Sequence, residues 1–270
     1  MLYHKPFINR NSSEWVVFVH GAGGSSAIWY KQLRDFKDHF NVLLVDLRGH
    51  GKSKGNGIMD AFDKNYTFKK VSLDIIEVLD HLKIEKAHFI GISLGTIIIR
   101  TLGEIAPQRV SSMIMGGAIT RLTLRHNCFV WLGNAFKYIV PYIWLYSFLA
   151  WVIMPKKRHN ESRNLFIREA KKLYQKEFIK WFKLTDEVNP LLKFFREKEL
   201  KLPILYIMGS EDYMFLSPVQ QMVKIHKNSI LDIIENCGHV VNIEKPDVFN
   251  QKAIQFILGL TNQQSQTQLT

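Results

Sequence analysis

The sequence predicts an α/β fold in which a mostly parallel, doubly wound sheet carries helices on both faces. Short runs rich in β-branched and aromatic residues alternate with longer runs whose apolar residues recur at helical spacing. Such alternation is typical of parallel sheets. The 270 residues, 47% of them hydrophobic, also suffice for one large core with a smaller appended domain.

The elements follow one another regularly outside the middle of the chain. Strands are predicted over residues 16–19, 42–45, 87–90 and 111–115, and helices over 27–36, 71–82 and 94–105. In the helix over 71–82, apolar side chains share one face and acidic side chains occupy the other. The alternation resumes with strands over 204–208 and 230–234 and a helix over 247–258. We expect the Gln- and Thr-rich residues 261–270 to form a disordered tail.

Residues 119–200 break the alternation, and they predict a helical cap inserted into a core made of residues 1–118 and 201–260. The first half of the insertion is aromatic and the second half is basic. Apolar side chains between 166 and 182 recur at helical spacing, which indicates a cap helix packed against the rest of the protein.

A serine flanked by glycines stands where a predicted strand is followed by a helix. The motif Gly91-Ile92-Ser93-Leu94-Gly95 follows the strand over 87–90. The glycines suit a turn tight enough to expose the hydroxyl, since a side chain at either position would collide with the neighbouring strand and helix. This pattern is a nucleophile elbow, although it arises by chance in about one chain in ten of this length.

A nucleophilic serine needs a base and an acid, and two later loops offer them. His239 lies just after the strand over 230–234, and Asp212 follows the strand over 204–208. Because the carboxyl ends of parallel strands meet at one edge of the sheet, Ser93, Asp212 and His239 are expected to lie together. Glu211 is the alternative acid.

Two backbone N–H groups would complete the site as an oxyanion hole. One is expected from Leu94, the residue after the serine, and the other from Ala22 in the turn His20-Gly21-Ala22-Gly23-Gly24. This turn lacks the Gly-Lys-Ser/Thr ending of a phosphate loop and the glycine spacing of a dinucleotide site, which argues against nucleotide binding.

These motifs resemble those of the α/β-hydrolase fold with a cap. The resemblance rests, in family order, on His20-Gly21-Ala22-Gly23-Gly24, Asp46-Leu47-Arg48-Gly49-His50-Gly51-Lys52-Ser53, Gly91-Ile92-Ser93-Leu94-Gly95, Gly209-Ser210-Glu211-Asp212, and Gly238-His239 followed by Glu244-Lys245-Pro246. It implies a helical cap inserted after the sixth strand, a nucleophile at Ser93, an acid at Asp212 and a base at His239.

The resemblance also implies roles for other residues. Asp46, Arg48 and His50 mainly brace a turn in this family. Trp29 and the aromatic residues of the cap are candidates for lining an acyl pocket, with packing in the core as an equal alternative. The prediction includes no cofactor and no metal.

The charge of the chain suits an anionic surface. Lys and Arg outnumber Asp and Glu by 36 to 24, and residues 156–201 alone hold 14 basic and 7 acidic residues. Peripheral membrane contact through the cap and a solvated basic helix face both fit this charge. Nucleic-acid binding is not predicted, because zinc-ligand spacing, an aromatic-basic motif and a long basic run are all lacking. The sequence leaves the oligomeric state open.

Residues 138–155 carry no charge and are long enough to cross a membrane. A single span there would put Ser93 on one side of the membrane and Asp212 and His239 on the other, so the span and the shared site exclude each other. Only two cysteines occur and no signal peptide opens the chain, which predicts a reducing, cytoplasmic location.

The predicted function is hydrolysis of carboxylic esters, as in carboxylesterases and lipases. The expected substrate is a small-molecule acyl ester, and lipid esters are among the candidates. Thioesterases, carbon–carbon bond hydrolases and perhydrolases also keep a serine at the elbow and stay as alternatives. A signalling protein that senses a small ligand is a further one. Dehalogenases and epoxide hydrolases use an aspartate at this position, so Ser93 argues against both.

Overall fold

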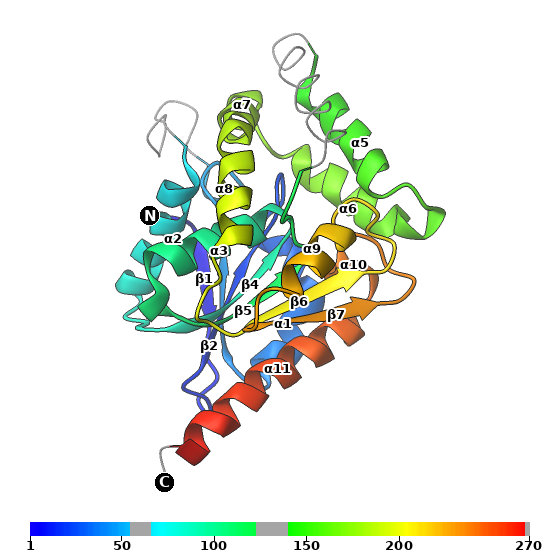
Figure 1. Ribbon diagram of the computed structural model, residues 1–270. Coiled ribbons are helices and arrows are strands. Elements are labelled where there is room, and N and C mark those ends of the chain that lie inside the picture. The colour runs from blue at the N-terminus through cyan, green and yellow to red at the C-terminus, as the bar shows by residue number, and fades with distance from the viewer. Residues whose placement is uncertain (55–65, 123–139, 268–270) are drawn as a thin grey trace.

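One mostly parallel sheet forms the centre of the protein (Figure 1). The computed structural model describes residues 1–54, 66–122 and 140–267. Over these residues the sheet has seven strands in the order β1-β3-β2-β4-β5-β6-β7. The strands are β1 His4–Phe7, β2 Trp15–Val19, β3 Asn41–Val45, β4 Ala87–Ile92, β5 Val110–Gly116, β6 Ile204–Gly209 and β7 Ser229–Ile234. Only the β1–β3 pair among them is antiparallel, which confirms the predicted sheet.

Helices cover both faces of this sheet, because its central strands are apolar on both sides. Val17 and Val19 of β2 pack into the cluster that holds the apolar faces of α2 and α3, whereas Val16 and Phe18 pack into the cluster of α1 and α11. The helices are α1 Tyr30–Lys37, α2 Phe68–His81, α3 Leu94–Ile105, α5 Tyr142–Ile153, α6 Asn160–Ala170, α7 Gln175–Lys183, α8 Thr185–Glu197, α9 Leu216–Val223, α10 Val241–Glu244 and α11 Pro246–Thr267. The doubly wound architecture is therefore confirmed.

Both ends of the chain differ from the sequence-based expectation. Strand β1 was not predicted, because it is a short edge strand whose residues are only partly buried and which contains Pro6. Helix α11 continues to Thr267, so residues 261–267, expected to be disordered, are helical. Proline is absent from this extension, and a helix whose first turns are packed propagates readily through such residues.

The helical insertion lies between β5 and β6, so among the described residues it follows the fifth strand and not the sixth. The difference arises because a single antiparallel strand, β1, precedes the parallel part of the sheet. Residues 123–139, which open the insertion, lie outside the described residues, and α5 to α8 stand over one edge of the sheet (Figure 1). We call residues 119–200 the cap.

The cap has an apolar cluster of its own and a second connection to the main core. Tyr146 of α5 packs with Ala170, Leu173 and Phe178 in the separate cluster. Trp181 and the buried side chains of α8 join the main cluster above α2 and α3 instead. Within the uncharged stretch 138–155, the described residues include α5, which is a helix of 12 residues. In the described chain, no helix is both long and apolar enough to span a bilayer.

Candidate active site

Ser93 occupies a sharp turn between β4 and α3, as the elbow motif predicts. Its backbone angles, φ 54° and ψ −120°, lie in a region that residues other than glycine rarely adopt. A Cβ on Gly91 would lie 2.8 Å from the carbonyl of Gly95, and a Cβ on Gly95 would lie 2.4 Å from the carbonyl oxygen of Val19. Both glycines are therefore required by close backbone contacts.

Asp212 and His239 approach Ser93 from the loops that follow β6 and β7. His239 Nδ1 lies 2.7 Å from Asp212 Oδ2, and His239 Nε2 lies 2.9 Å from Ser93 Oγ. A carboxylate only accepts hydrogen bonds, so Nδ1 carries the hydrogen and Nε2 is left to accept the serine hydroxyl. The structure thus brings the three predicted residues together at the carboxyl edge of the sheet.

The surroundings of Asp212 and His239 hold both side chains in place. Asp212 is 1% exposed and His239 is 3% exposed. The second carboxylate oxygen of Asp212 accepts the N–H of Phe215 at 3.3 Å, and the Phe215 ring packs on the imidazole with centroids 5.1 Å apart. Buried charges need such partners, and here they also orient the ring.

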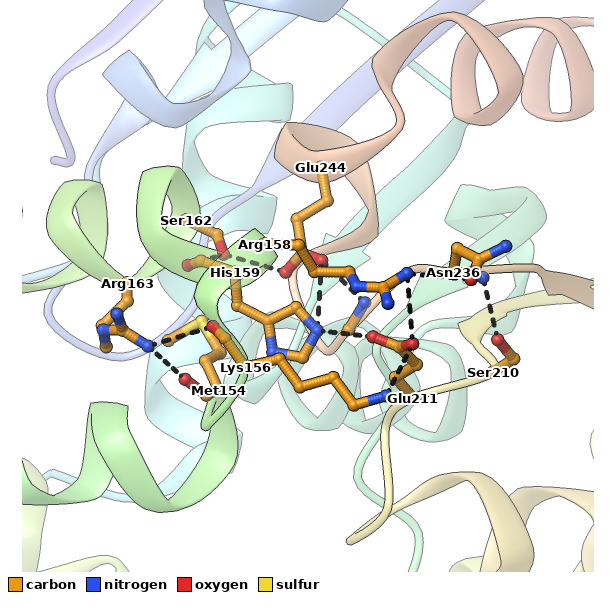
Figure 2. A network of polar contacts seen from close by, with 11 residues as sticks. Met154, Lys156, Arg158, His159, Ser162, Arg163, Ser210, Glu211, Asn236 and Glu244 are labelled. Carbon is orange, nitrogen blue, oxygen red and sulfur yellow. Dashed lines mark hydrogen bonds and ion pairs between the residues drawn. The ribbon is translucent and has the colours of Figure 1, made fainter.

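Glu211, the alternative acid, points away from His239. Its carboxylate accepts hydrogen bonds from Lys156 Nζ at 2.8 Å and from His159 Nε2 at 3.0 Å, both of which belong to the cap (Figure 2). Hydrogen bonds from Lys156 and from His159 lower the pKa of Glu211. Of the two neighbouring acids, Asp212 is therefore the one that contacts the imidazole.

The glycine-rich turn after β2 is held next to Ser93. A Cβ on Gly21 would lie 3.2 Å from Ser93 Cβ. The N–H of Gly24 donates to the carbonyl oxygen of Gly21 at 3.1 Å, and the N–H of Gly23 donates to His50 Nε2 at 3.1 Å. Ala22 and Leu94, the two residues expected to form an oxyanion hole, both line the cavity beside the serine.

The turn-bracing roles expected for Asp46, Arg48 and His50 agree with their contacts. Asp46 accepts the backbone N–H groups of Ser26 at 2.7 Å and Lys52 at 2.8 Å. Arg48 forms two hydrogen bonds with the Asp74 carboxylate, at 2.6 and 2.7 Å. Burial lowers the pKa of His20, and burial together with nearby His20 holds the pKa of His50 well below its usual range.

A cavity of about 320 Å³ opens onto Ser93 and His239 and is lined almost entirely by apolar side chains. The cap and the loops at the sheet edge supply its walls, including Leu145, Leu149, Phe178, Phe182, Val188 and Met214. Apolar cavities with a few polar groups are typical of small-molecule sites. This one suits an uncharged, largely hydrocarbon ligand.

Trp29 does not line this cavity, contrary to one of the two roles considered for it. The side chain is fully buried and packs against Phe18, with ring centroids 4.8 Å apart. The 3₁₀ turn Ser26–Trp29 places Ile28 at the cavity and directs the neighbouring indole into the core between α1 and α11.

Glu169 is a cavity residue that the sequence analysis did not identify. It is the only carboxylate among the described lining residues, and it accepts a hydrogen bond from Ser25 Oγ at 2.8 Å and from Lys172 Nζ at 2.6 Å. Helical spacing places Glu169 on the same face of α6 as Ser162 and Leu165. This spacing was the only sign in the sequence that Glu169 faces the cavity. Its proximity to the turn after β2 required the tertiary structure.

Sequence comparisons point in the same direction. The sequence profile of a family described as alpha/beta hydrolase fold matches residues 14–138. The chain is 26% identical over 252 residues to an uncharacterized carboxylesterase, nap, of Bacillus subtilis. The alignment covers 89% of this chain and 78% of that protein. It is 27% identical over 269 residues to a putative 2-succinyl-6-hydroxy-2,4-cyclohexadiene-1-carboxylate synthase of the same organism, covering 93% and 92%.

Solved structures share the fold over nearly the full chain. A hydrolase from Oleispira antarctica superposes with a TM-score of 0.81 at 18% identity and covers 94% of each chain. MenH from S. aureus superposes with a TM-score of 0.78 at 18% identity and covers 97% of this chain and 100% of its own. With this sheet order, the profile match over 14–138 and these structural neighbours, the chain has the α/β-hydrolase fold.

Proposed function

We propose that this protein is a serine esterase, similar to carboxylesterases and lipases, that works through an acyl-enzyme intermediate. The observation that carries the proposal is the hydrogen-bond chain from Asp212 through His239 to Ser93, with distances of 2.7 and 2.9 Å, at the wall of an apolar cavity. Relatives named as carboxylesterases, 26% and 23% identical to the chain, support ester bonds as the target.

In the proposed reaction, Ser93 Oγ attacks the ester carbonyl while His239 Nε2 takes the hydroxyl proton. The tetrahedral intermediate collapses, the bond to the alcohol oxygen breaks, and His239 returns the proton to the departing alcohol. A water molecule, deprotonated by His239, then attacks the acyl-serine, the bond between the acyl carbon and Ser93 Oγ breaks, and His239 returns the proton to Oγ as the carboxylic acid leaves. Asp212 keeps the hydrogen on Nδ1 throughout and stabilises the imidazolium.

The negative oxygen of the intermediate would be held by the N–H groups of Leu94 and Ala22. Leu94 begins α3, so its N–H lies at a helix N-terminus, where amides lack an intrahelical acceptor. In the turn after β2, Gly23 and Gly24 already donate to His50 and Gly21. This use of the neighbouring amides favours Ala22 as the second donor.

The proposed substrate is an uncharged acyl ester, with lipid esters included, and the proposed location is the cytosol with peripheral contact between the cap and a membrane. The apolar walls of the cavity favour an acyl group as the ligand. The exposed aromatic residues on α5 favour contact with a membrane. Cys237 is fully buried and its pKa is raised by burial, so it does not compete with Ser93 as a nucleophile.

Chemistry other than ester hydrolysis is the second candidate, because a relative at 27% identity is named as a putative carboxylate synthase and not as an esterase. The same serine, imidazole and carboxylate would serve either reaction. Initial rates on a panel of ester, thioester and diketone substrates would rank the chemistries. Turnover confined to diketones would replace the esterase proposal.

Labelling with a fluorophosphonate probe tests the nucleophile directly. We expect the wild-type protein to react at Ser93 and to hydrolyse p-nitrophenyl esters, and we expect Ser93→Ala to abolish both. Ser13→Ala is the matched control, because this exposed serine lies in the loop before β2 and is not part of the hydrogen-bond chain. A Ser93→Ala protein with wild-type ester hydrolysis would remove the mechanism, whereas a folded wild-type protein that fails to label would support ligand sensing.

A further inference from the structure

A cluster of polar side chains joins the cap to the two loops that carry Asp212 and His239 (Figure 2). Its members are Lys156, Arg158, His159 and Ser162 from the cap, and Glu211 and Glu244 from the core. We call this group the cap–core cluster. None of the hydrogen bonds and ion pairs of this cluster involves Ser93, although Ser162 also lines the cavity, and the esterase mechanism above uses none of its residues.

Glu211 connects the cluster to the loop after β6, because it directly precedes Asp212 in the chain. Lys156 lies 2.8 Å and His159 3.0 Å from its carboxylate oxygens, and Arg158 lies 3.4 Å away. The Glu211 side chain is only 9% exposed, so these three cap residues provide the charge and hydrogen bonds that a buried carboxylate requires.

Glu244 of α10 connects the cluster to the loop after β7. Its carboxylate accepts the N–H of Gly238 at 2.7 Å, and Gly238 directly precedes His239. The other carboxylate oxygen accepts a hydrogen bond from Ser162 Oγ of the cap at 2.8 Å. The backbone N–H of the residue before His239 is therefore connected to the cap through one carboxylate.

His159 stands at the centre of the cluster, with its ring directed between the two carboxylates (Figure 2). The ring is fully buried, and Nε2 lies 3.0 Å from Glu211 and 3.8 Å from Glu244. Because both neighbours only accept, Nε2 must carry a hydrogen. A Cβ on Gly238 would lie 2.9 Å from this nitrogen, so the ring also packs directly against the His239 loop. Among the described residues Nδ1 has no hydrogen-bond partner.

The two loops also contact each other. The N–H of Glu211 donates to the carbonyl oxygen of Cys237 at 2.8 Å. A Cβ on Gly209 would lie 2.1 Å from the carbonyl oxygen of Gly238, which shows how closely the backbones approach. A displacement of either loop would therefore move the other, and the cap residues hold the pair from one side.

We propose that His159 and Glu211 are positioning residues, through which the seated cap holds Asp212 and His239 in register with Ser93. The proposal rests on the proposed function, since it concerns the alignment of that same hydrogen-bond chain. Neither residue contacts the reacting atoms. Their effect passes through the loop backbone at the residues immediately before Asp212 and His239.

The test compares three substitutions at one position. His159→Ala removes the Nε2 donor, and we expect kcat for a p-nitrophenyl ester to fall about 10- to 100-fold, with KM within about twofold, because displacements near 1 Å cost this much. His159→Gln places an amide N–H where Nε2 stood and should restore kcat to within about threefold of wild type. His159→Asn carries the same amide on a shorter side chain that does not reach Glu211, and should behave like His159→Ala.

Two further measurements separate positioning from simple loss of structure. The low-field proton resonance of the His239–Asp212 hydrogen bond should broaden or shift in His159→Ala and in Glu211→Gln, and it should stay in place in His159→Gln. Lys157→Ala, at an exposed cap residue outside the cluster, should leave both the resonance and kcat unchanged. Melting temperatures identify any variant that does not fold.

The outcomes separate this inference from the esterase proposal. If wild type is active, Ser93→Ala is inactive, and folded His159→Ala keeps wild-type kcat and an unshifted resonance, the positioning roles are wrong and the esterase stands. Equal losses in the Gln, Asn and Ala variants, each in step with its melting temperature, would also overturn the inference. A wild-type protein without labelling at Ser93 rejects the esterase itself, and the resonance comparison still tests the loop alignment.

Discussion

The buried imidazoles of His20 and His50 use both ring nitrogens on backbone groups. Nδ1 of His20 donates to the carbonyl oxygen of Gly21 at 2.8 Å while Nε2 accepts the N–H of Leu47 at 3.0 Å. In His50, Nδ1 donates to the carbonyl oxygen of Arg48 and Nε2 accepts the N–H of Gly23. A second ring hydrogen would destroy either acceptor, so the fold next to Ser93 requires both rings to be neutral.

Stability should therefore fall as the pH decreases below about 6.5, the ordinary histidine pKa. Burial keeps the folded-state pKa of both rings lower than that value, so the unfolded chain binds more protons in this range. Each ring contributes full stability above pH 6.5 and loses up to about 1.4 kcal/mol per pH unit below it. Urea unfolding at pH 7.5, 6 and 5 measures this slope.

Histidine substitutions identify the rings responsible. His50→Gln should flatten the slope by up to about 1.4 kcal/mol per pH unit, because one buried titrating group is lost. His39→Gln, at an exposed histidine, is the matched control and should leave the slope as in wild type. A free energy of unfolding that is constant from pH 7.5 to 5 would contradict the neutral buried rings.

At the scale of elements, α5 is unusual because it is apolar on all sides. Tyr146 and Ala150 are buried, Tyr146 against other helices of the cap, while Trp144 and Trp151 stay 67% and 55% exposed on the opposite side of α5. A helix that is apolar all round is normally buried. Indole rings favour the interface between water and lipid, and exposed Lys157 follows shortly after the helix.

The proposed membrane contact predicts that the double variant Trp144→Ser, Trp151→Ser loses most of its binding to vesicles. We expect the wild type to float with vesicles that contain anionic phosphatidylserine, and less so at high salt, because the cap is basic. Hydrolysis of a short soluble ester should not change, since neither indole lines the cavity.

A surface control keeps this test specific. Ile225→Ser removes an apolar side chain that is 70% exposed but lies after α9, outside the cap, and it should bind vesicles like wild type. Equal flotation of wild type and the double tryptophan variant would reject α5 as the contact. A wild-type protein that never floats would reject the membrane contact as a whole.

At the scale of the whole molecule, the cap and the sheet edge together form the cavity, so substrate selection belongs to neither alone. Ser93 and His239 come from the core, whereas Leu145, Phe178 and Val188 come from the cap. Each methylene group buried in such a space stabilises the bound state by about 0.8 kcal/mol, or about fourfold in kcat/KM. Rates should rise with acyl length until the cavity is full.

Val188→Phe should shift that optimum to shorter chains, because Val188 is a buried wall residue and the added ring occupies the cavity. Over a series of p-nitrophenyl esters from acetyl to palmitoyl, we expect kcat/KM for the preferred long ester to fall about tenfold or more and that for the acetate to stay within about twofold. Val248→Phe, at a residue 38% exposed on α11, is the matched control. Identical length profiles for all three proteins would mean that the acyl group binds elsewhere.

Local sequence was sufficient for the parallel part of the sheet and for the meeting of the three polar residues. The order of short apolar runs specifies parallel strands, and parallel strands end at a common edge, so Ser93, Asp212 and His239 followed from their places after β4, β6 and β7. Gly91 and Gly95 signalled the elbow because the contacts that exclude a side chain there come from the turn itself and from the adjacent strand. Such constraints recur in short motifs.

The tertiary structure alone decided matters that depend on distant partners. Glu211 and Asp212 are adjacent carboxylates, and only the positions of His159 and His239 show that one contacts the cap and the other the imidazole. Trp29 lies in the core and Glu169 lines the cavity because of contacts with residues that are distant in the sequence. The direction of a side chain depends on which residues, many positions away, supply its hydrogen bonds and apolar contacts, and periodicity carries no information about those partners.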